Sequence, residues 1–454
     1  MTRPPAEPVS YARRLGLFSG TMSVIGGIIG SGIFLNPAIV AQRVGTASLT
    51  LLAWVLGGVV AILGGFIYAE LGCRLPKAGG PYAYLRAGIH PLAGFLYAWA
   101  LLLIMATGAG AAVSYTFASY AADLFGLAPS FRTPLAIGAI GIFTVINIFG
   151  VQLGAWTQNV FVLLKLGALA LLICAGLWLS PASGGLPVAC DHCTVAAPVT
   201  LLGTVLAMAT AFVPVLFAYG GWQQTNFIAE EIVAPERNLP RALLLGVAVV
   251  VLVYLSANAA YLRVLGVGGL AASTAPAAET LGAVMGPLGR KLIALGVVIS
   301  TGGFLNAITL LSPRVYQAMA RDGLFLESFA RLHPRWRTPV VAIVFQGIWS
   351  VVLLSSGSYG HLLDYVVFAD WIFFGSTAAS LLFLRARSRR ANEAPPAFQT
   401  PGSPIPELLF IAAALYVVAG SVVSNPGNAA RGIGLILLGI PVYRYWSGRA
   451  STGS

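Results

Sequence analysis

Residues 26–34 read GGIIGSGIF, in the middle of an apolar run from Leu15 to Val40. The run has the length and composition of a membrane-spanning helix. Glycine is about 1 kcal/mol less favourable than alanine in a helix interior. Four glycines among nine residues therefore predict a poor helix, and another interaction must compensate for that cost.

The composition sets the broad class of the protein. Of 454 residues, 58% are apolar and only 9% are charged, whereas about 25% are charged in globular proteins. A membrane-spanning helix needs roughly 20 apolar residues. Twelve such runs begin near residues 17, 47, 92, 134, 157, 203, 242, 291, 339, 361, 405 and 429. We therefore expect an all-α polytopic membrane protein with twelve transmembrane helices.

The basic residues predict the orientation, because short cytoplasmic loops retain Lys and Arg. With both termini inside, nineteen of the 26 Lys and Arg residues lie in inside segments, six lie outside, and Lys165 lies within a span. The net charge of +12 then gathers near anionic lipid head groups. This placement of the excess positive charge indicates a lipid bilayer as the partner, so we expect no nucleic acid partner.

The runs divide the chain without leaving room for a soluble domain, so function must lie within the helix bundle. The expected segments are a cytoplasmic tail (1–16), five helices (17–180), an external loop (181–202), five helices (203–384), a cytoplasmic linker (385–404), two helices (405–446) and a cytoplasmic tail (447–454).

A second weak point lies in the sixth run, where residues 214–227 read PVLFAYGGWQQTNF. Pro214, Gly220 and Gly221 disfavour a continuous helix there. Tight helix packing through small residues would explain Gly26 and Gly30 alone. Two weak points five helices apart instead favour two inverted five-helix repeats, each with an interrupted first helix.

Interrupted helices leave backbone groups free, and these are tolerated in a membrane only where they line a cavity. Free N–H groups at a helix start suit an anion. Free carbonyl oxygens suit an ammonium group. A cavity that offers both predicts a zwitterionic ligand, and an α-amino acid is the obvious one.

Three motifs then carry a family resemblance: GSGIF before Pro37, FAYGGWQQTNFIAEEIVAPERNLPRA (217–242) and SPRVYQAMARDG (312–323). Together they resemble the amino acid-polyamine-organocation superfamily, and most of all its L-amino-acid transporter family. The resemblance implies a LeuT-like 5+5 inverted repeat with discontinuous helices 1 and 6, followed by helices 11 and 12. It also implies a sodium-independent exchanger of neutral L-amino acids in the inner or plasma membrane that works by alternating access.

The resemblance also implies roles for residues at the two interruptions. The N–H groups of Ser31 and Gly32 would hold the substrate carboxylate, and carbonyls of Ile28, Phe217 and Gly220 its amine. The ring of Phe217 would close over the substrate. The residues expected to contact the substrate are Ile28, Gly30, Ser31, Gly32, Phe217, Ala218, Gly220, Trp222 and Gln223, with Gln224 as a further source of selectivity.

Lys165 lies about 13 Å into its span from Trp156, at 1.5 Å per residue. Snorkelling to the interface is one interpretation, but an intramembrane lysine more often faces the bundle interior. In the resembling family such a lysine replaces the sodium of sodium-coupled relatives, which implies contacts with Gly26 or Gly27 and with Ser300 or Thr301. Whether it is a fixed tether or a proton carrier, which would make a proton-coupled symporter, stays open.

The remaining polar residues permit several interpretations. Asp370 is either a proton or substrate partner or a packing residue, and Glu70, Glu230 and Glu231 are expected to pair with arginines. Cys190 and Cys193 form either a local disulfide or an unpaired surface pair. No catalytic or metal-ligand motif occurs, so we expect no enzyme, cofactor or metal. We also expect no heavy-chain subunit, and a non-transporting amino acid sensor remains an alternative.

Overall fold

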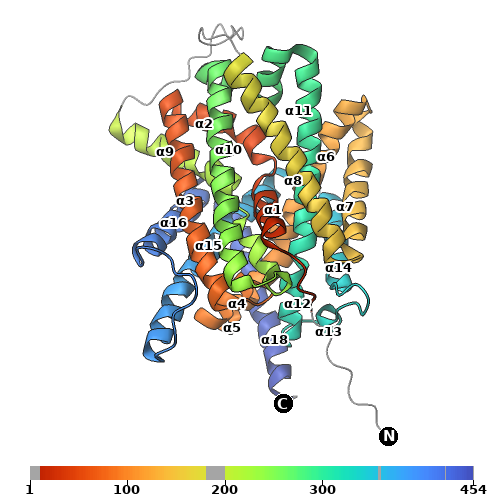
Figure 1. The fold of residues 1–454 in the computed structure, drawn as a ribbon, viewed down its shortest axis with the longest axis vertical. Coiled ribbons are helices and arrows are strands. Elements are labelled where there is room, and N and C mark those ends of the chain that lie inside the picture. Colours follow the sequence, from red (N-terminus) through yellow and green to blue (C-terminus); the bar gives the residue numbers. More distant parts are fainter. Residues whose placement is uncertain (1–10, 180–199, 356–358, 425, 453–454) are drawn as a thin grey trace.

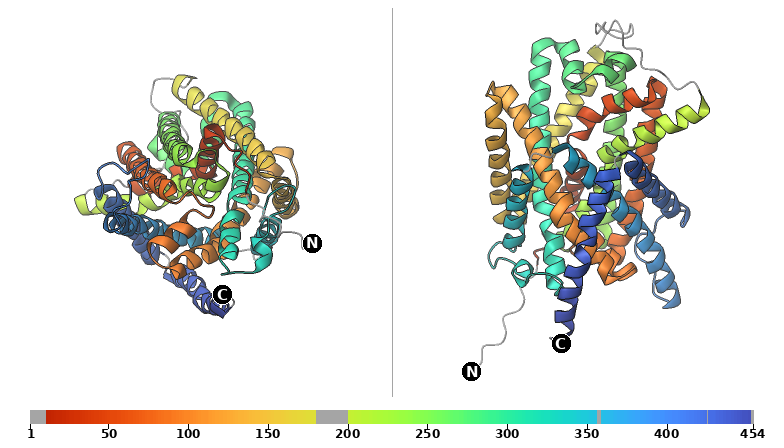
Figure 2. Two further views of the ribbon diagram at one scale, coloured as in Figure 1. Left: turned by 60° about the horizontal axis from the view of Figure 1, so that its bottom comes forward. Right: turned by 180° about the vertical axis from the view of Figure 1, so that it is seen from behind.

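The computed structural model describes residues 11–179, 200–355, 359–424 and 426–452, and the expected Cys190–Cys193 motif lies outside them. The described chain is a bundle of helices (Figures 1 and 2). Its first half contains α1 (Leu17–Ile28), α2 (Gly32–Val44), α3 (Ala47–Arg74), α4 (Pro81–Gly88), α5 (Pro91–Ala100), the π-helix η1 (Leu101–Met105), α6 (Ala106–Phe125), the 3-10 turn η2 (Pro129–Phe131), α7 (Arg132–Ile148), α8 (Val151–Cys174) and the π-helix η3 (Ala175–Leu179).

The second half has the same helical character. It contains α9 (Leu201–Tyr219), the 3-10 helix η4 (Trp222–Glu231), α10 (Pro235–Ala272), α11 (Pro276–Leu311), α12 (Pro313–Arg321), α13 (Glu327–Ala330), α14 (Val340–Ser355), α15 (Tyr359–Arg390), α16 (Ile405–Ser424), α17 (Pro426–Leu437) and α18 (Gly439–Thr452). Each of the twelve predicted runs starts in or immediately before one of these helices. Within the described ranges the only β-type pairing is a single bridge between Leu15 and Ile232.

Eight helical segments of the described chain are long and apolar enough to cross a membrane. A ninth span results if α1 and α2 count as one segment, bent by 42° at the residues between them. Large apolar side chains such as Phe18, Leu252 and Trp178 are exposed on the outside of the bundle, as lipid contact requires. The chain is therefore a multi-pass membrane protein.

Helix α1 lies inside the bundle, where it packs against α8, α10 and α11. Eight of its twelve residues are buried, among them Gly26, Gly27 and Ile28. Helix α3 packs along α10, and α8 along α11, so long helices surround α1 (Figure 1). This arrangement keeps the interrupted backbone after Ile28 away from lipid.

Candidate functional site: a cavity between two interrupted helices

The first interruption separates α1 from α2. Helix α1 ends at Ile28, residues 29–31 leave the helical path, and α2 begins at Gly32. Ser31 precedes α2 and makes no side-chain cap. The first N–H groups of a helix have no intrahelical acceptor, so the start of α2 presents free donors. The predicted break is confirmed.

The second interruption follows α9, which ends at Tyr219. Gly220 is extended, and Gly221 has a φ of 115°, a backbone conformation that L side chains rarely adopt. The chain then forms the 3-10 helix η4, and the Gln223 side chain accepts a hydrogen bond from the Gly221 N–H at 3.1 Å. A glycine pair thus turns the chain, as the sequence predicts.

The two interruptions lie directly against each other. A Cβ atom at Gly27 would come within 2.9 Å of the Gly221 carbonyl oxygen, and one at Gly32 within 3.0 Å of Ala218. The Tyr254 hydroxyl on α10 lies 3.3 Å from the Ile28 carbonyl oxygen and 3.2 Å from that of Ala218. Tyr254 therefore links the ends of α1 and α9, although it lies in an apolar run with no local signal for this role.

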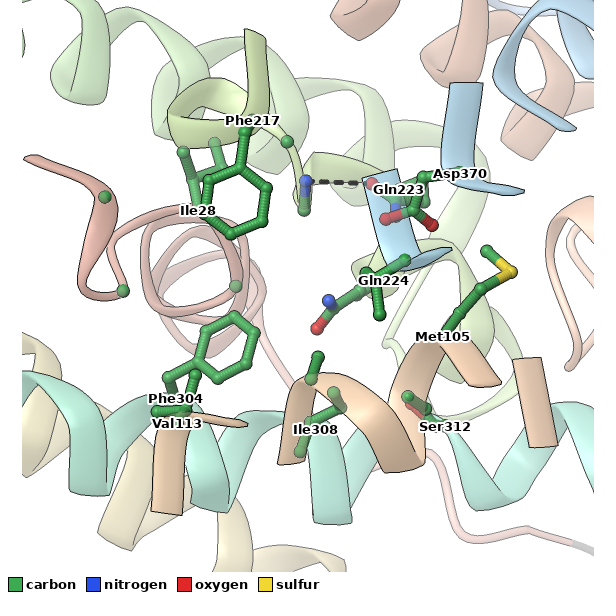
Figure 3. A pocket seen from close by; sticks show the side chains of 18 of the residues that line it. Ile28, Met105, Val113, Phe217, Gln223, Gln224, Phe304, Ile308, Ser312 and Asp370 are labelled. Atoms are coloured by element: carbon green, nitrogen blue, oxygen red, sulfur yellow. Dashed lines mark hydrogen bonds between the residues drawn. The ribbon is translucent and has the colours of Figure 1, made fainter. Parts of the chain in front are cut away.

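One cavity opens at this junction (Figure 3). Its wall comes from both interruptions and from η1, α6, α11 and α15. Of the residues expected to contact a substrate, it includes Ile28, Gly30, Ser31, Gly32, Phe217, Ala218, Gly220 and Gln223, together with Gln224. Residues that the sequence did not single out include Met105, Phe304 and Ile308.

Trp222 occupies a different position from the other expected residues. Its side chain is fully buried and packs against Tyr68, Phe374 and Phe410. A Cβ atom at Gly64 would come within 2.7 Å of its ring. Trp222 therefore packs η4 against α3, α15 and α16. It is not among the described residues that line the cavity.

Lys165 reaches the first interruption from α8. Its side chain is fully buried, and its Nζ donates a hydrogen bond to the Ile29 carbonyl at 2.6 Å and a longer one to Gly26 at 3.5 Å. Both acceptors belong to the end of α1, where carbonyls lose their intrahelical partners. The side chain therefore faces the bundle interior and does not snorkel.

Ser300 and Thr301, the expected neighbours of Lys165 on α11, donate their hydrogen bonds to other groups. The Ser300 hydroxyl donates to the Gly30 carbonyl at 3.1 Å, and the Thr301 hydroxyl donates to Val297 of its own helix at 2.7 Å. Ser300 thus satisfies a second carbonyl of the first interruption. Together, Lys165 and Ser300 hold three carbonyls at the end of α1.

A chain of amides extends from this site between α7, α8 and α11. Asn306 donates to Gln158 at 3.0 Å and accepts from Asn147 at 2.9 Å. Gln158 lies against Gly26 so closely that a Cβ atom there would come within 1.7 Å of its Nε2. Gly26 is therefore required by this contact, which the sequence did not reveal.

Ion pairs lie near one end of the cavity's helices. Glu231 and Arg314 pair at 2.8 Å with exposures of 1% and 0%, and Glu230 pairs with Arg321 at 3.0 Å. Tyr11 lies over Arg314, 6.0 Å from ring centroid to guanidinium. The Glu231 carbonyl accepts from the Arg14 and Leu15 N–H groups at 3.0 Å. These two hydrogen bonds join the chain before α1 to the end of η4.

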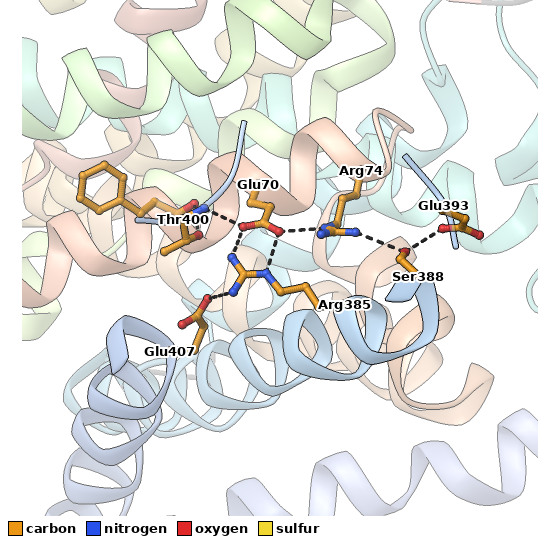
Figure 4. A network of polar contacts seen from close by, with 8 residues as sticks. Glu70, Arg74, Arg385, Ser388, Glu393, Thr400 and Glu407 are labelled. Atoms are coloured by element: carbon orange, nitrogen blue, oxygen red, sulfur yellow. Dashed lines mark hydrogen bonds and ion pairs between the residues drawn. The ribbon is translucent and has the colours of Figure 1, made fainter. Parts of the chain in front are cut away.

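A second charge network joins α3, α15 and α16 (Figure 4). Buried Glu70 accepts hydrogen bonds from Arg74 at 2.9 Å, from Arg385 at 2.8 Å and from the Thr400 N–H at 2.7 Å. Arg385 also pairs with Glu407 at 2.8 Å. The expected pairing of Glu70, Glu230 and Glu231 with arginines is confirmed.

A multi-pass helical protein whose interior cavity lies between two interrupted helices has the architecture of a solute transporter. The chain belongs to the amino acid permease family, whose model matches residues 15–442, and the predicted superfamily is thereby confirmed. It is accordingly a transporter of this family and not an enzyme.

Three relatives illustrate the family. The chain is 31% identical to the serine/threonine exchanger SteT of Bacillus subtilis (strain 168), over 96% of this chain and 97% of that protein. It is 32% identical to the human large neutral amino acids transporter small subunit 2, over 96% and 82% of the two chains. It is 33% identical to the mouse Asc-type amino acid transporter 1, also over 96% and 82%.

Proposed function

We propose that this chain is a sodium-independent exchanger of neutral L-amino acids that works by alternating access. The observation that carries the proposal is the shared cavity of the two interrupted helices, whose wall includes the residues at the start of α2 and at the ends of α1 and α9. Its similarity to a serine/threonine exchanger and to a large neutral amino acids transporter subunit supports exchange and neutral substrates.

The two ends of an α-amino acid find complementary groups in this cavity. The substrate carboxylate binds the N–H groups of Ser31 and Gly32 at the start of α2, where the helix dipole favours an anion. The ammonium binds carbonyls at the ends of α1 and α9, those of Ile28, Phe217 and Gly220. The Phe217 ring covers the bound substrate.

Lys165 supports sodium independence. Its ammonium group already donates a hydrogen bond to the Ile29 carbonyl at 2.6 Å and lies 3.5 Å from the Gly26 carbonyl. A sodium ion at the same oxygens would lie next to a fixed positive charge, and the two cations would repel each other. Lys165 therefore takes the place of a coupling cation and tethers α8 to α1.

The membrane topology that fits this function has twelve spans, an inverted 5+5 repeat and both termini in the cytoplasm. The interruptions of α1–α2 and α9–η4 support the repeat, because each lies in the first span of its half. Excess Lys and Arg at the inside segments supports the orientation. We place the protein in the cell membrane and expect it to work without a heavy-chain subunit.

A proton-coupled symporter on the same scaffold is the second candidate. The observation that favours it is a pair of ionisable side chains inside the bundle, Lys165 on α8 and Asp370 on α15. Intramembrane ionisable groups are common in proton pathways.

Proteoliposomes separate these candidates. We expect uptake of labelled serine to require internal amino acid and to ignore imposed sodium and proton gradients. Uptake into empty vesicles driven by an inward proton gradient would instead establish the symporter. Binding without counterflow would indicate a sensor.

A further inference from the structure

The described wall of the cavity carries one acidic side chain, and it comes from α15 rather than from either interruption. Asp370 on α15 contributes a carboxylate to its wall, and among the described lining residues there is no other acidic group and no Lys, Arg or His. The Asp370 carboxylate has no hydrogen-bond or ion-pair partner in the described part of the chain. A lone carboxylate inside a membrane protein needs a cation or several donors to offset the loss of water.

The position of Asp370 separates it from the groups that would hold the substrate backbone. Figure 3 shows Asp370 on the side of the cavity opposite Ile28 and Phe217. The wall contributed by η1, α6 and α11 is mainly apolar and includes Met105, Ala109 and Ile308. An amino acid held at the interruptions would therefore extend its side chain along an apolar wall towards a carboxylate.

That combination suits a side chain with a methylene stem and a cationic end, because the stem contacts apolar surface while the end pairs with a carboxylate. A hydroxyl group would donate one hydrogen bond but leave the negative charge unpaired. We propose that Asp370 forms a side-chain subsite that admits L-amino acids with a terminal ammonium group, of the lysine and ornithine class, alongside neutral ones. This inference rests on the proposed amino acid exchange.

The test uses proteoliposomes of the full chain loaded with unlabelled serine. Labelled serine and labelled lysine are supplied outside in separate assays. The wild-type chain is expected to take up both. Asp370→Asn keeps the shape of the side chain and removes its charge. It is expected to lower lysine uptake relative to serine uptake at least about tenfold, the loss of a charged hydrogen bond.

Asp123→Asn is the matched control, because Asp123 pairs with Arg132 at the protein surface and lies outside the cavity. It should leave both uptakes unchanged. Asp370→Glu keeps the charge and should retain lysine uptake. Retained uptake in this variant would show that a substitution at this position does not by itself prevent folding. Reduced lysine uptake in Asp370→Asn alone among these variants would support the subsite.

Three results would overturn the inference. Wild-type exchange of serine with no lysine uptake would leave the proposed function standing and remove the subsite. An equal loss of serine and lysine uptake in Asp370→Asn would make Asp370 a structural residue. Serine uptake that follows a proton gradient in the wild type but not in Asp370→Asn, without lysine uptake, would make it a proton carrier. Failure of the wild type to exchange any amino acid would instead overturn the proposed function itself.

Discussion

Gly221 lies against the backbone of Gly27, so closely that a Cβ atom at Gly221 would come within 2.1 Å of the Gly27 carbonyl oxygen. The two interruptions therefore meet backbone to backbone at the cavity. Helices can approach this closely only where neither carries a side chain at the contact. The glycine-rich sequences at both sites serve this contact as well as the breaks themselves.

Gly221→Ala should disrupt the junction. The added methyl group collides with backbone, and the φ of 115° is strained for alanine. We expect a loss of stability on the order of 2 kcal/mol or more and loss of exchange. Thermal unfolding in detergent and serine counterflow would measure both. Gly167→Ala on α8 is the control, since nothing lies within 4 Å of its Cβ position. Wild-type stability and transport in Gly221→Ala would contradict the described junction.

Lys165→Met should impair transport while keeping the length of the side chain. It leaves the Ile29 carbonyl without its 2.6 Å donor inside the bundle, and an unsatisfied buried acceptor costs about 1–3 kcal/mol. We expect counterflow of serine to fall at least about tenfold. Lys291→Met, at an exposed position on α11, should transport normally. Equal transport in the two variants would argue against the tether.

Tyr254→Phe removes only the hydroxyl group shared by the Ile28 and Ala218 carbonyls. We expect a destabilisation of about 1 kcal/mol and slower exchange, because α1 and α9 are then less firmly joined. Tyr445→Phe on α18 is a suitable comparison, since Tyr445 is exposed. If the two variants melt at the same temperature, the hydroxyl bridge contributes nothing measurable.

The buried Glu231–Arg314 pair should behave differently from a surface pair. Arg314→Met leaves a buried carboxylate without its partner and should cost about 3–5 kcal/mol. The double variant Glu231→Gln with Arg314→Met should recover part of that loss. In the exposed Glu327–Arg331 pair the corresponding loss should stay below about 1 kcal/mol. Similar losses at both pairs would show that Arg314 is not enclosed as described.

The sequence predicted the breaks because their signals are local. Gly30 lies in the first break and Gly220 and Gly221 lie in the second, whereas Gly26 and Gly27 remain inside α1 and Pro214 remains inside α9. The interior position of Lys165 was equally predictable, because its depth in an apolar run exceeds the reach of snorkelling.

The contacts between distant elements were not predictable in the same way. Tyr254, Gln158 and Asn306 lie in runs with no local signal for function, and only packing brings them to the interruptions. Trp222 follows the second glycine pair directly, yet η4 turns its ring away from the cavity into a cluster with Tyr68 and Phe374. Which side of a 3-10 helix faces the ligand depends on tertiary packing.

Competition against labelled serine in counterflow tests whether the two interruptions hold the two ends of an amino acid. The competitors are unlabelled serine, ethanolamine, which lacks the carboxylate, and 3-hydroxypropionate, which lacks the amine. If the Ser31 and Gly32 N–H groups hold the carboxylate while the carbonyls of α1 and α9 hold the amine, both analogues should compete at least about tenfold more weakly than serine, since each loses charged hydrogen bonds. Either analogue competing as well as serine would contradict the assignment of the two interruptions to the two ends of an amino acid.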